Sequence, residues 1–534
     1  MILHQIFISG CRIVSVILAT ADEDVPVFQD NKDFKQYRRV KMFSIRFFSA
    51  LLFMMMIFSQ ALPAMGLADL NNPLPCSLTA AESEMISGDY RGYLQNLRME
   101  LSGGRGFRKP VGPIRFPGEF EPAEGICFSW AGYTDLLKAL ISEASQEMKV
   151  FLAVSSFYQG SASRTLEAAG ARMENLVFVD SSLDSVWMRD FGPYFIYGDS
   201  GNREIIDCLY NRPRPNDDKF PSILGKVLGV KSHLCSLIMP GGNFMTDGHG
   251  LGIMTDVVFD PSQGGDPDMS LDQLKQYMRE YFGITKVIIL KDLARDGTGH
   301  VDIFAKLLDD TNIIVGKYAR PQDGFAGNYE ILEENARILA NETNGRGEKF
   351  RITRIPMPAY KSYVTYTHTN STILNDKVFV PIYNRGTDEE ALAVYRKVLP
   401  GHKVIGFDCN DVITANGAIH CITKLVMAAP LKISAPILPF EIDRGRTAYV
   451  RVRVQTAAGS DEAVRVKLHW SANPEGPFIS EEATRTAEGR YLVTLPDPDQ
   501  GSEVWYFISA EIPGRACVTL PENGVDEPVH LISR

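Results

Sequence analysis

The sequence predicts an α/β body at residues 113–430, followed by a smaller β domain at residues 431–534. In the body, apolar runs of strand length alternate with amphipathic stretches of helical period. After Pro430 the helical period disappears, and apolar and polar residues alternate one by one, as in half-buried strands. The length of 534 residues also exceeds that of one ordinary domain, so two or three domains are expected.

The body is expected to contain strands and helices in alternation. Apolar runs predict strands at 149–154, 177–179, 287–290, 313–315 and 377–381. Amphipathic stretches predict helices at 133–148, 270–282 and 389–399. On periodicity alone, this order favours a doubly wound sheet. Residues 67–112 precede the body as an N-terminal lead-in, with a helix-like stretch at 90–101.

The C-terminal domain shows a period of two residues. Val450, Val452 and Val454 alternate with arginines, and the same pattern returns at 464–470, 491–495 and 504–508. Turn-forming residues at 473–476 and 497–499 separate these runs. Several short alternating strands over about 100 residues predict an antiparallel, immunoglobulin-like β-sandwich.

Residues 1–66 are expected to be a leader that contains a signal peptide. An apolar segment at 47–58 follows several lysines and arginines and precedes a small-x-small cleavage site at 64–66. The segment is short for a membrane span, although a single membrane anchor is the alternative reading. Residues 1–41 do not fit a signal peptide and indicate an over-extended start, with translation beginning near residue 40 or 42. The protein is therefore expected to be exported, to the periplasm, the medium or the cell surface.

Charge and cysteine content narrow the classes of partner. The net charge of −10 argues against nucleic acid or an anionic membrane as partner, and favours cationic substrates. Of eight cysteines, Cys11 lies in the leader and Cys421 lies in a glycine-containing turn. The other six could form disulfides in an oxidising compartment, with a connectivity that spacing does not give. Because there is no CxxC pair, we expect neither structural zinc nor any other metal or cofactor.

Three separated motifs point to one chemistry. They are Cys421 at 416–423, His300 and Asp302 at 299–302, and Asp190 at 187–193. A thiolate can attack the resonance-stabilised carbon of a guanidinium, and carboxylates hold the planar cation through paired N–H groups. A histidine can protonate the departing ammonia and then activate water against the thiouronium intermediate.

These motifs belong to a longer series of seven stretches in order, which are residues 117–125, 187–193, 210–218, 241–248, 299–302, 369–371 and 417–423. The series resembles the Porphyromonas-type peptidylarginine deiminases and the related agmatine deiminases of the guanidine-modifying pentein superfamily. The resemblance implies a five-bladed, pseudo-symmetric α/β propeller in place of a doubly wound sheet, with the active site on its axis and no cofactor.

The resemblance also implies roles for single residues. Cys421 is the nucleophile, His300 is the general acid and base, Asp190 and Asp302 grip the guanidinium, and Asn370 orients the histidine or the substrate. Trp187 and Asp247 are implied to bind substrate. Each residue also has an ordinary structural alternative. Cys421 could be an inert buried thiol, His300 and Asp302 could be metal ligands, and Asp190 could form a salt bridge with Arg189. Asn370 could be a structural amide, Trp187 a core side chain, and Asp247 part of a turn.

Arg212 and Arg214 bear on the substrate. Each precedes a proline, so an extended backbone is expected, with both side chains on one face. In the resembled enzymes that act on C-terminal arginine, this pair binds the α-carboxylate. A solvated loop is the alternative.

The sequence thus predicts a peptidylarginine deiminase that converts arginine at the C-terminus of peptides to citrulline. An agmatine deiminase of putrescine biosynthesis is the alternative, because residues 191–193 look more like that type. An inactive binding or adhesion protein on the same fold is a further alternative, and so is a cysteine protease. The expected partner is an arginine-containing peptide or a small guanidino compound. The sequence does not indicate an oligomeric state.

Overall fold

The computed structural model describes residues 68–102, 107–198 and 202–428. It also describes residues 431–533 except for 436–437, 444–446, 457–463, 487–489, 497–502, 513–515 and 522–523. All of these residues belong to one compact unit, Gly66–Arg534. The expected leader and its signal peptide lie outside the described residues.

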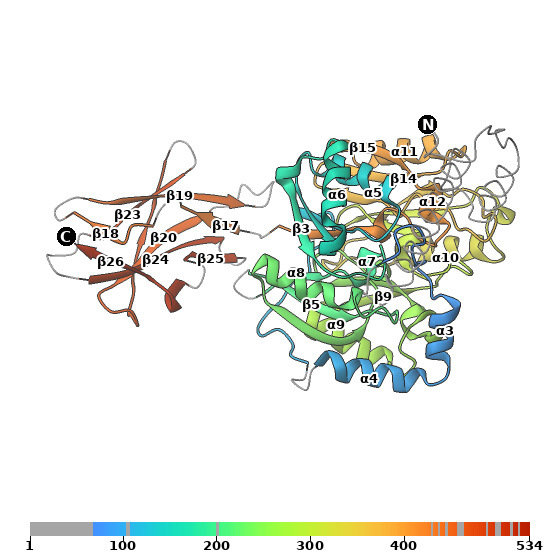
Figure 1. The fold of residues 1–534 in the computed structure, drawn as a ribbon, viewed down its shortest axis with the longest axis horizontal. Coiled ribbons are helices and arrows are strands. Elements are labelled where there is room, and N and C mark those ends of the chain that lie inside the picture. Colours follow the sequence, from blue (N-terminus) through green and yellow to red (C-terminus); the bar gives the residue numbers. More distant parts are fainter. Residues whose placement is uncertain are drawn as a thin grey trace, which may run out of the picture. The chain divides into compact units, whose positions relative to one another are not determined.

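The body consists of five small sheets that share one strand order (Figure 1). In each sheet, a short strand pairs antiparallel with the next strand, which then pairs parallel with a third. Four sheets are consecutive triplets: β4 (Tyr194–Tyr197), β5 (Arg203–Leu209) and β6 (Ser232–Ile238); β7 (Met245–Thr246), β8 (Leu251–Thr255) and β9 (Lys286–Leu290); β10 (Ala305–Leu307), β11 (Asn312–Lys317) and β12 (Arg351–Pro356); β13 (Thr372–Leu374), β14 (Lys377–Ile382) and β15 (Lys403–Asp408).

The remaining sheet joins the two ends of the body. Its strands are β1 (Ala123–Ser129), β2 (Lys149–Val154), β3 (Leu176–Asp180) and β16 (Lys424–Met427). The late strand β16 pairs antiparallel with the early strand β1, with Ile126 opposite Leu425. The single doubly wound sheet that periodicity favoured is therefore not formed, because the parallel strands are divided among five separate sheets with at most three parallel strands in each.

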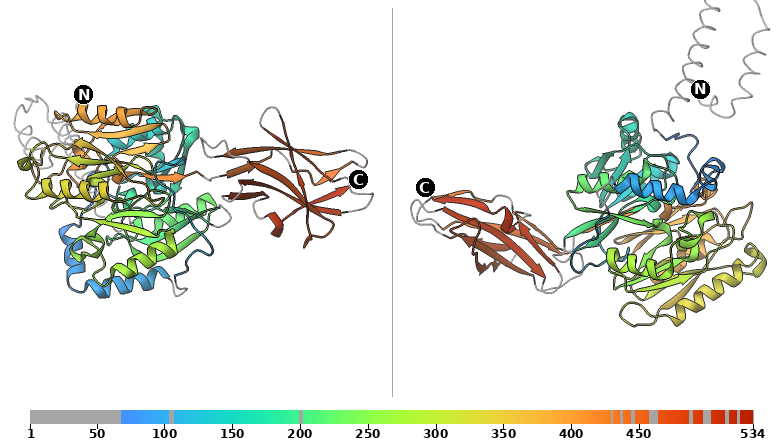
Figure 2. Two further views of the ribbon diagram at one scale, coloured as in Figure 1. Left: turned by 180° about the vertical axis from the view of Figure 1, so that it is seen from behind. Right: turned by 90° about the horizontal axis from the view of Figure 1, so that it is seen from below.

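Helices lie on the crossovers between parallel strands. They are α5 (Thr134–Ala144), α6 (Ser156–Ala168), α8 (Phe220–Leu228), α9 (Leu271–Phe282), α10 (Asn328–Asn341) and α11 (Asp388–Val398). Figure 2 shows α10, in yellow, at the outer side of this part of the body, where it packs on β11 and β12. The fold of the body is thus mixed α/β, as the alternating pattern predicted.

Local sequence explains where the helices begin and end. In α9, Ser270 and Gln273 form a capping box, and Gly283 ends the helix in the left-handed conformation at φ 68°. The predicted helix at 270–282 is confirmed by this element. The predicted helix at 133–148 is shorter in the structure, because Tyr133 has a φ of 49° and α5 already ends at Ala144.

Residues 431–533 form two sheets. One contains β17 (Leu431–Ser434), β19 (Tyr449–Thr456), β23 (Tyr491–Thr494) and β22 (Thr484–Arg485). The other contains β18 (Glu441–Ile442), β26 (Val529–Ser533), β24 (Glu503–Ile512), β20 (Arg465–Ser471), β21 (Ile479–Glu482) and β25 (Ala516–Leu520). Val450 and Val452 are buried while Arg451 and Arg453 are exposed, so the period of two separates a core face from a solvent face.

The lead-in, in blue in Figure 1, contains two helices, α3 (Ala80–Ser87) and α4 (Tyr90–Ser102). Thr79 and Glu82 form a capping box at the start of α3. In α4, which matches the predicted helical stretch, Leu94 packs against Leu209 and Ile238 of the body. Residues 68–79 precede α3 without regular secondary structure, and this short segment reaches the interior of the body.

Within the described residues, six cysteines are free thiols, namely Cys76, Cys127, Cys208, Cys235, Cys409 and Cys421. Five of them belong to the six for which disulfides were considered. The sixth, Cys517, has its side chain outside the described residues. Within the described part of the chain, no helix combines the length and the apolar character that crossing a membrane requires. Over the same residues, no group of three or more His, Cys, Asp or Glu side chains is arranged to hold a metal ion.

Candidate active site

The five sheets of the body each present a short turn at the same position. These turns are α7 (Met188–Phe191) before β4, η3 (Gly241–Asn243) before β7, η6 (Val301–Ile303) before β10, the residues just before β13, and η8 (His420–Ile422) before β16. Asp190, Gly242, Asp302, Asn370 and Cys421 each lie within four residues of the strand that follows. Five distant parts of the sequence therefore meet through structurally equivalent turns.

The thiol of Cys421 is held by Asn370. The Asn370 carboxamide oxygen accepts hydrogen bonds from the amides of Ala418 and Cys421, at 3.2 and 3.3 Å. Its Nδ2 donates to Cys421 Sγ at 3.2 Å. Both residues are fully buried. One amide thus fixes the turn that carries the thiol and also contacts the sulfur.

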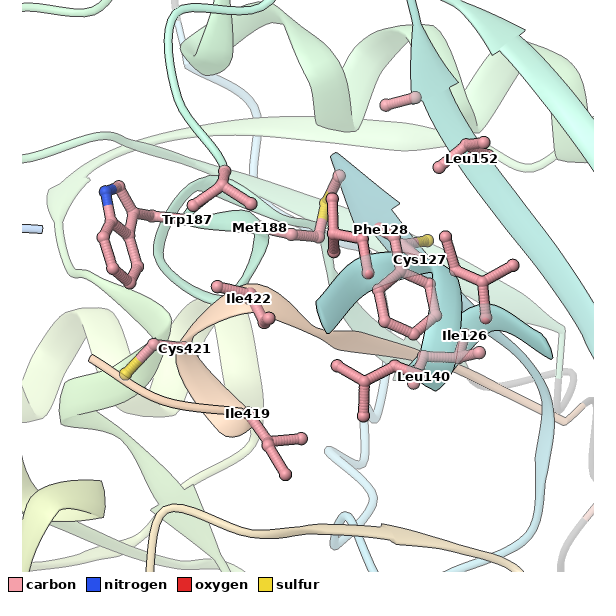
Figure 3. Close-up of a cluster of buried hydrophobic side chains, with 14 of the residues drawn as sticks. Ile126, Cys127, Phe128, Leu140, Leu152, Trp187, Met188, Ile419, Cys421 and Ile422 are labelled. Atoms are coloured by element: carbon pink, nitrogen blue, oxygen red, sulfur yellow. The ribbon is translucent and has the colours of Figure 1, made fainter. Parts of the chain in front are cut away.

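The surroundings of Cys421 are apolar on one side. In Figure 3 the Cys421 sulfur points away from the aliphatic side chains of Ile422, Ile126 and Leu140. A side chain at Gly417 would not fit, because its Cβ would lie 2.4 Å from the Trp187 ring and 3.2 Å from Cys421 Sγ. Glycine at this position lets the indole and the thiol approach each other.

His300, Asp190 and Asp302 converge on Gly242. A methyl group added to Gly242 would lie 2.6 Å from His300 Nδ1, 2.9 Å from Asp190 Oδ1 and 3.1 Å from Asp302 Oδ2. The Gly242 amide also donates to Asp190 Oδ1 at 3.0 Å. The structure therefore brings the predicted histidine and both predicted carboxylates around a residue that must lack a side chain.

His300 is poised to exchange protons. Its Nδ1 lies 3.6 Å from Asp190 Oδ1, and neither ring nitrogen has a hydrogen-bond partner among the described residues. Burial lowers the pKa of His300, and the charges of Asp190 and Asp302 offset this effect only in part. The imidazole is therefore neutral near pH 7, with one nitrogen free to accept a proton.

Asp302 connects the thiol to a chain of charged groups. Cys421 Sγ lies 3.8 Å from Asp302 Oδ2, and the same oxygen lies 2.6 Å from His420 Nδ1. His420 Nε2 lies 2.7 Å from Glu119 Oε2. Burial raises the pKa of Asp302, but the hydrogen bond and charge of His420, with the charges of His300 and Arg189, outweigh burial and hold that pKa below its usual value.

The His420 ring thus lies between the carboxylates of Asp302 and Glu119. Burial and the charges of Arg189 and Lys306 lower the pKa of His420 well below its usual value, and Asp302 offsets this only in part. Buried Arg189 pairs with Glu119 and donates from Nε to the His420 carbonyl at 3.1 Å. Arg189 thus pairs with Glu119 rather than with Asp190, which was the alternative reading of Asp190.

Trp187 and Asp247 occupy different surroundings. Trp187 is fully buried, and its indole nitrogen donates to the Leu74 carbonyl at 2.8 Å. Asp247 accepts hydrogen bonds from the amides of His249, Leu251 and Gly345 at 2.8, 3.0 and 2.6 Å. Trp187 therefore borders the Cys421 thiol, whereas Asp247 binds the backbone amides of its own loop and of Gly345.

Arg212 and Arg214 do not lie in extended backbone. The amide of Arg214 donates to the carbonyl of Arg212 at 2.8 Å, which makes a tight turn centred on Pro213. The expectation of an extended segment is wrong here, because the fixed φ of proline also suits the centre of such a turn.

Both arginine side chains are buried and bind the lead-in. Arg214 forms a two-point ion pair with Glu82, at 2.8 and 3.2 Å. Arg212 Nε donates to the Cys76 carbonyl at 2.9 Å. The structure thus gives Arg214 a carboxylate partner from within the chain itself.

Four residues at the site were not assigned from the sequence. Gly242, Glu119 and His420 lie inside the motif stretches, where a signal was available. Cys76 lies in the lead-in and had none. Its thiol donates to Asp190 Oδ2 at 3.2 Å, and its amide donates to the Ala415 carbonyl at 2.9 Å. The single S–H of Cys76 can instead be donated to the Cys421 sulfur, as the alternative hydrogen bond between the two side chains.

Comparison with known proteins places this site in a family context. The sequence model of the Porphyromonas-type peptidyl-arginine deiminase family matches residues 115–426. A protein of Latilactobacillus sakei with the provisional name agmatine deiminase is 26% identical over 359 residues, covering 59% of this chain and 96% of that protein. A protein of Vibrio parahaemolyticus with the same provisional name is 24% identical, with the same coverage of both chains.

Solved structures agree with the fold of the body. A provisionally named arginine deiminase of Porphyromonas gingivalis superposes with a TM-score of 0.53 at 22% identity, covering 58% of this chain and 98% of the other. The agmatine deiminase of Enterococcus faecalis superposes with a TM-score of 0.53 at 23% identity, covering 60% and 99%. The mixed α/β fold of the body is therefore that of deiminases.

Proposed function

Because the chain belongs to the Porphyromonas-type peptidyl-arginine deiminase family, we propose that it converts arginine at the C-terminus of peptides to citrulline and ammonia. Family membership makes the protein a hydrolase that cleaves a C–N bond of a guanidinium group. The observation that carries the proposal is the convergence of His300, Asp190 and Asp302 on Gly242, with the Cys421 sulfur 3.8 Å from Asp302 Oδ2.

The first chemical step is attack by sulfur. The hydrogen bond from Cys76 lowers the pKa of Cys421, but burial and the charges of Asp302 and Asp190 outweigh it and raise the pKa. A guanidinium between the two carboxylates would neutralise that repulsion and favour the thiolate. The thiol proton passes to His300, the sulfur bonds to the guanidinium carbon, and His300 returns the proton to the nitrogen that leaves as ammonia.

The second step is hydrolysis of the resulting S-alkylthiouronium. Neutral His300 takes a proton from water, the hydroxide adds to the same carbon, and the C–S bond breaks to release the thiolate. The hydroxyl proton passes to the sulfur as the ureido C=O forms, and His300 gives its proton to solvent, so Cys421 and His300 both return to their starting states.

The finer description of the fold is part of the same proposal. The five sheets are the blades of one pseudo-symmetric propeller, and residues 431–534 form an immunoglobulin-like sandwich. Support comes from the strand order that the five sheets share and from the pairing of β16 with β1. Export to the periplasm, the medium or the cell surface is proposed from the sequence of residues 1–66 alone.

The preference for a C-terminal carboxylate is proposed from Arg212 and Arg214. Both guanidinium groups are buried, and Arg214 already binds a carboxylate, that of Glu82. Agmatine deiminase is the second candidate, because proteins with that provisional name match along 96% of their own length. Agmatine carries no carboxylate for the arginine pair.

A ureido colorimetric assay separates the candidates. The purified protein is given a peptide with C-terminal arginine, the amide of the same peptide, free arginine and agmatine. We expect the free-acid peptide to have the highest kcat/KM. A ratio of kcat/KM values between substrates does not depend on the fraction of active molecules. A higher kcat/KM for agmatine than for the peptide would move the function to agmatine deiminase.

A further inference from the structure

Residues 74–82 of the lead-in, called here the inserted segment, run through the candidate active site. The segment contacts the site at successive points along its length. Trp187 Nε1 donates to the Leu74 carbonyl at 2.8 Å, and Asn416 Nδ2 donates to Ser77 Oγ at 3.1 Å. Cys76 lies between these two points and is fully buried. The segment is therefore anchored on both sides of its cysteine.

The inserted segment occupies the groups that a substrate would need. Asp190, proposed to grip the guanidinium, accepts the Cys76 thiol at 3.2 Å. Arg212 binds the Cys76 carbonyl at 2.9 Å, and Arg214 binds the Glu82 carboxylate at 2.8 and 3.2 Å. A thiol thus meets Asp190, a carbonyl meets Arg212 and a carboxylate meets Arg214, so the segment supplies polar partners at the positions proposed to bind an arginine that ends a peptide.

We propose that the inserted segment is a built-in, substrate-like inhibitor, which holds the enzyme latent until the segment is displaced from Asp190 and Arg214. The inhibitory role rests on the proposed function, since it identifies the site as the one that binds guanidinium and carboxylate. Occlusion of Cys421 by the segment is a separate physical claim and is tested separately below.

The segment is built so that it can be released. In α3, which follows Thr79, the buried side chains are those of Glu82 and Ile86, while Met85 is 62% exposed. The ion pair of Glu82 with Arg214 is therefore a main attachment of this helix to the body. Removing one partner of a buried ion pair leaves the other charge uncompensated, so loss of the Glu82 charge favours displacement.

Competition within one chain has a kinetic signature. A substrate that competes with the inserted segment has an apparent KM equal to the intrinsic KM divided by the fraction of open molecules, while saturating substrate still reaches the full kcat. Weakening the segment should therefore lower KM and leave kcat nearly unchanged. A segment that only supports the catalytic groups would change kcat instead.

The experiment uses the full chain in reducing buffer, with Glu82→Gln and Glu82→Ala as test variants, because Glu82 contacts Arg214 and none of the reacting groups. Glu84→Gln is the control, because Glu84 lies on the same helix and is exposed. Two readouts are taken: the rate at which chloroacetamidine alkylates Cys421, located by mass spectrometry, and KM and kcat for agmatine. Agmatine has no carboxylate, so a change at Arg214 does not alter its direct contacts.

We expect both test variants to accelerate alkylation of Cys421 and to lower KM by about ten- to a hundredfold, the range for loss of one charge-assisted contact. Glu84→Gln should match the wild type. Equal alkylation rates in all four proteins, or a lower kcat in the test variants, would overturn the proposal. Faster alkylation without ureido product from any guanidine would support occlusion by the segment and reject the proposed hydrolysis.

Discussion

The thiol end of the site and the arginine end differ in how their polar groups are satisfied. At the thiol end, the turns of the five sheets hold the reacting groups, and both nitrogens of His300 lack partners among the described residues. At the arginine end, Arg212 donates to the carbonyls of Cys76 and Gln263, and Arg214 pairs with Glu82. The reacting centre is thus set by the turns of the body, whereas the arginine end is completed by a segment of the lead-in.

The strongest test of the thiol end is its nucleophile. Cys421→Ala and Cys421→Ser should each lower kcat/KM by about 10⁴–10⁶-fold, because no neighbouring group can replace the thiolate. The temperature of unfolding should stay close to that of the wild type, as should the circular dichroism spectrum. Activity within tenfold of the wild type would remove Cys421 from the mechanism.

The two carboxylates should rank next. Asp190→Asn and Asp302→Asn each remove one charged side of the guanidinium site, with a loss of about 2–5 kcal/mol in transition-state binding. Asp272→Asn is the control, because Asp272 is exposed in the first turn of α9. Steady-state kcat/KM measures all three. If neither test variant differs from the control by tenfold, the carboxylates do not hold the substrate.

Gly242→Ala tests the close approach of the reacting groups. The added methyl would lie 2.6 Å from His300 Nδ1 and 2.9 Å from Asp190 Oδ1, so at least one group must move. A shift of about 1 Å at a reacting group costs roughly 10²-fold in rate. Gly386→Ala is the matched control, because nothing lies within 4 Å of its Cβ position. Similar kcat values for the two variants would contradict the packing described here.

The arginine end should show a smaller effect, confined to substrates with a carboxylate. Replacing Arg212 and Arg214 by alanine should remove a preference of about ten- to a hundredfold for a C-terminal acid over its amide. Turnover of the amide should change less, since the reacting groups are untouched. Competition kinetics with the two peptides measures the preference. Its survival in the double variant would show that another group binds the carboxylate.

The smallest expected effect is a shift in the pH profile. His300 must be neutral to take the thiol proton, so kcat/KM falls as the pH drops through its pKa. Burial lowers that pKa below the ordinary 6.5. The acid limb of the profile should therefore lie below pH 6.5. Asp190 raises the pKa of His300, so Asp190→Asn should move the limb to lower pH. An acid limb at or above pH 6.5 would exclude His300 as the titrating group.

The sequence predicted the reacting end better than the binding end. The strand and helix runs at 149–154, 270–282 and 377–381 agree with β2, α9 and β14, because each carries a clear period and its own end signals. The turns with Cys421, His300 and Asp190 could be identified because motif residues are close in sequence within each turn. Their meeting place could be expected only through the family resemblance.

The binding end depends on contacts across long separations. Cys76 lies 114 positions before Asp190, and Glu82 lies 132 positions before Arg214. No local pattern links such residues, since the pairing arises only when the lead-in packs on the folded body. The turn at Pro213 was missed because proline fixes φ but allows both extended and turned ψ values.

The pairing of β16 with β1 has a consequence for the order of events during synthesis. Cys421 lies only a few residues before β16, which is the last strand of the body to leave the ribosome. A nascent chain that already carries Asp190, His300 and Asp302 still lacks the thiol and the strand that seats it. Domains fold as units when their last element emerges. The candidate active site is therefore completed in one step, when the last strand of the body emerges, and not gradually as the chain lengthens.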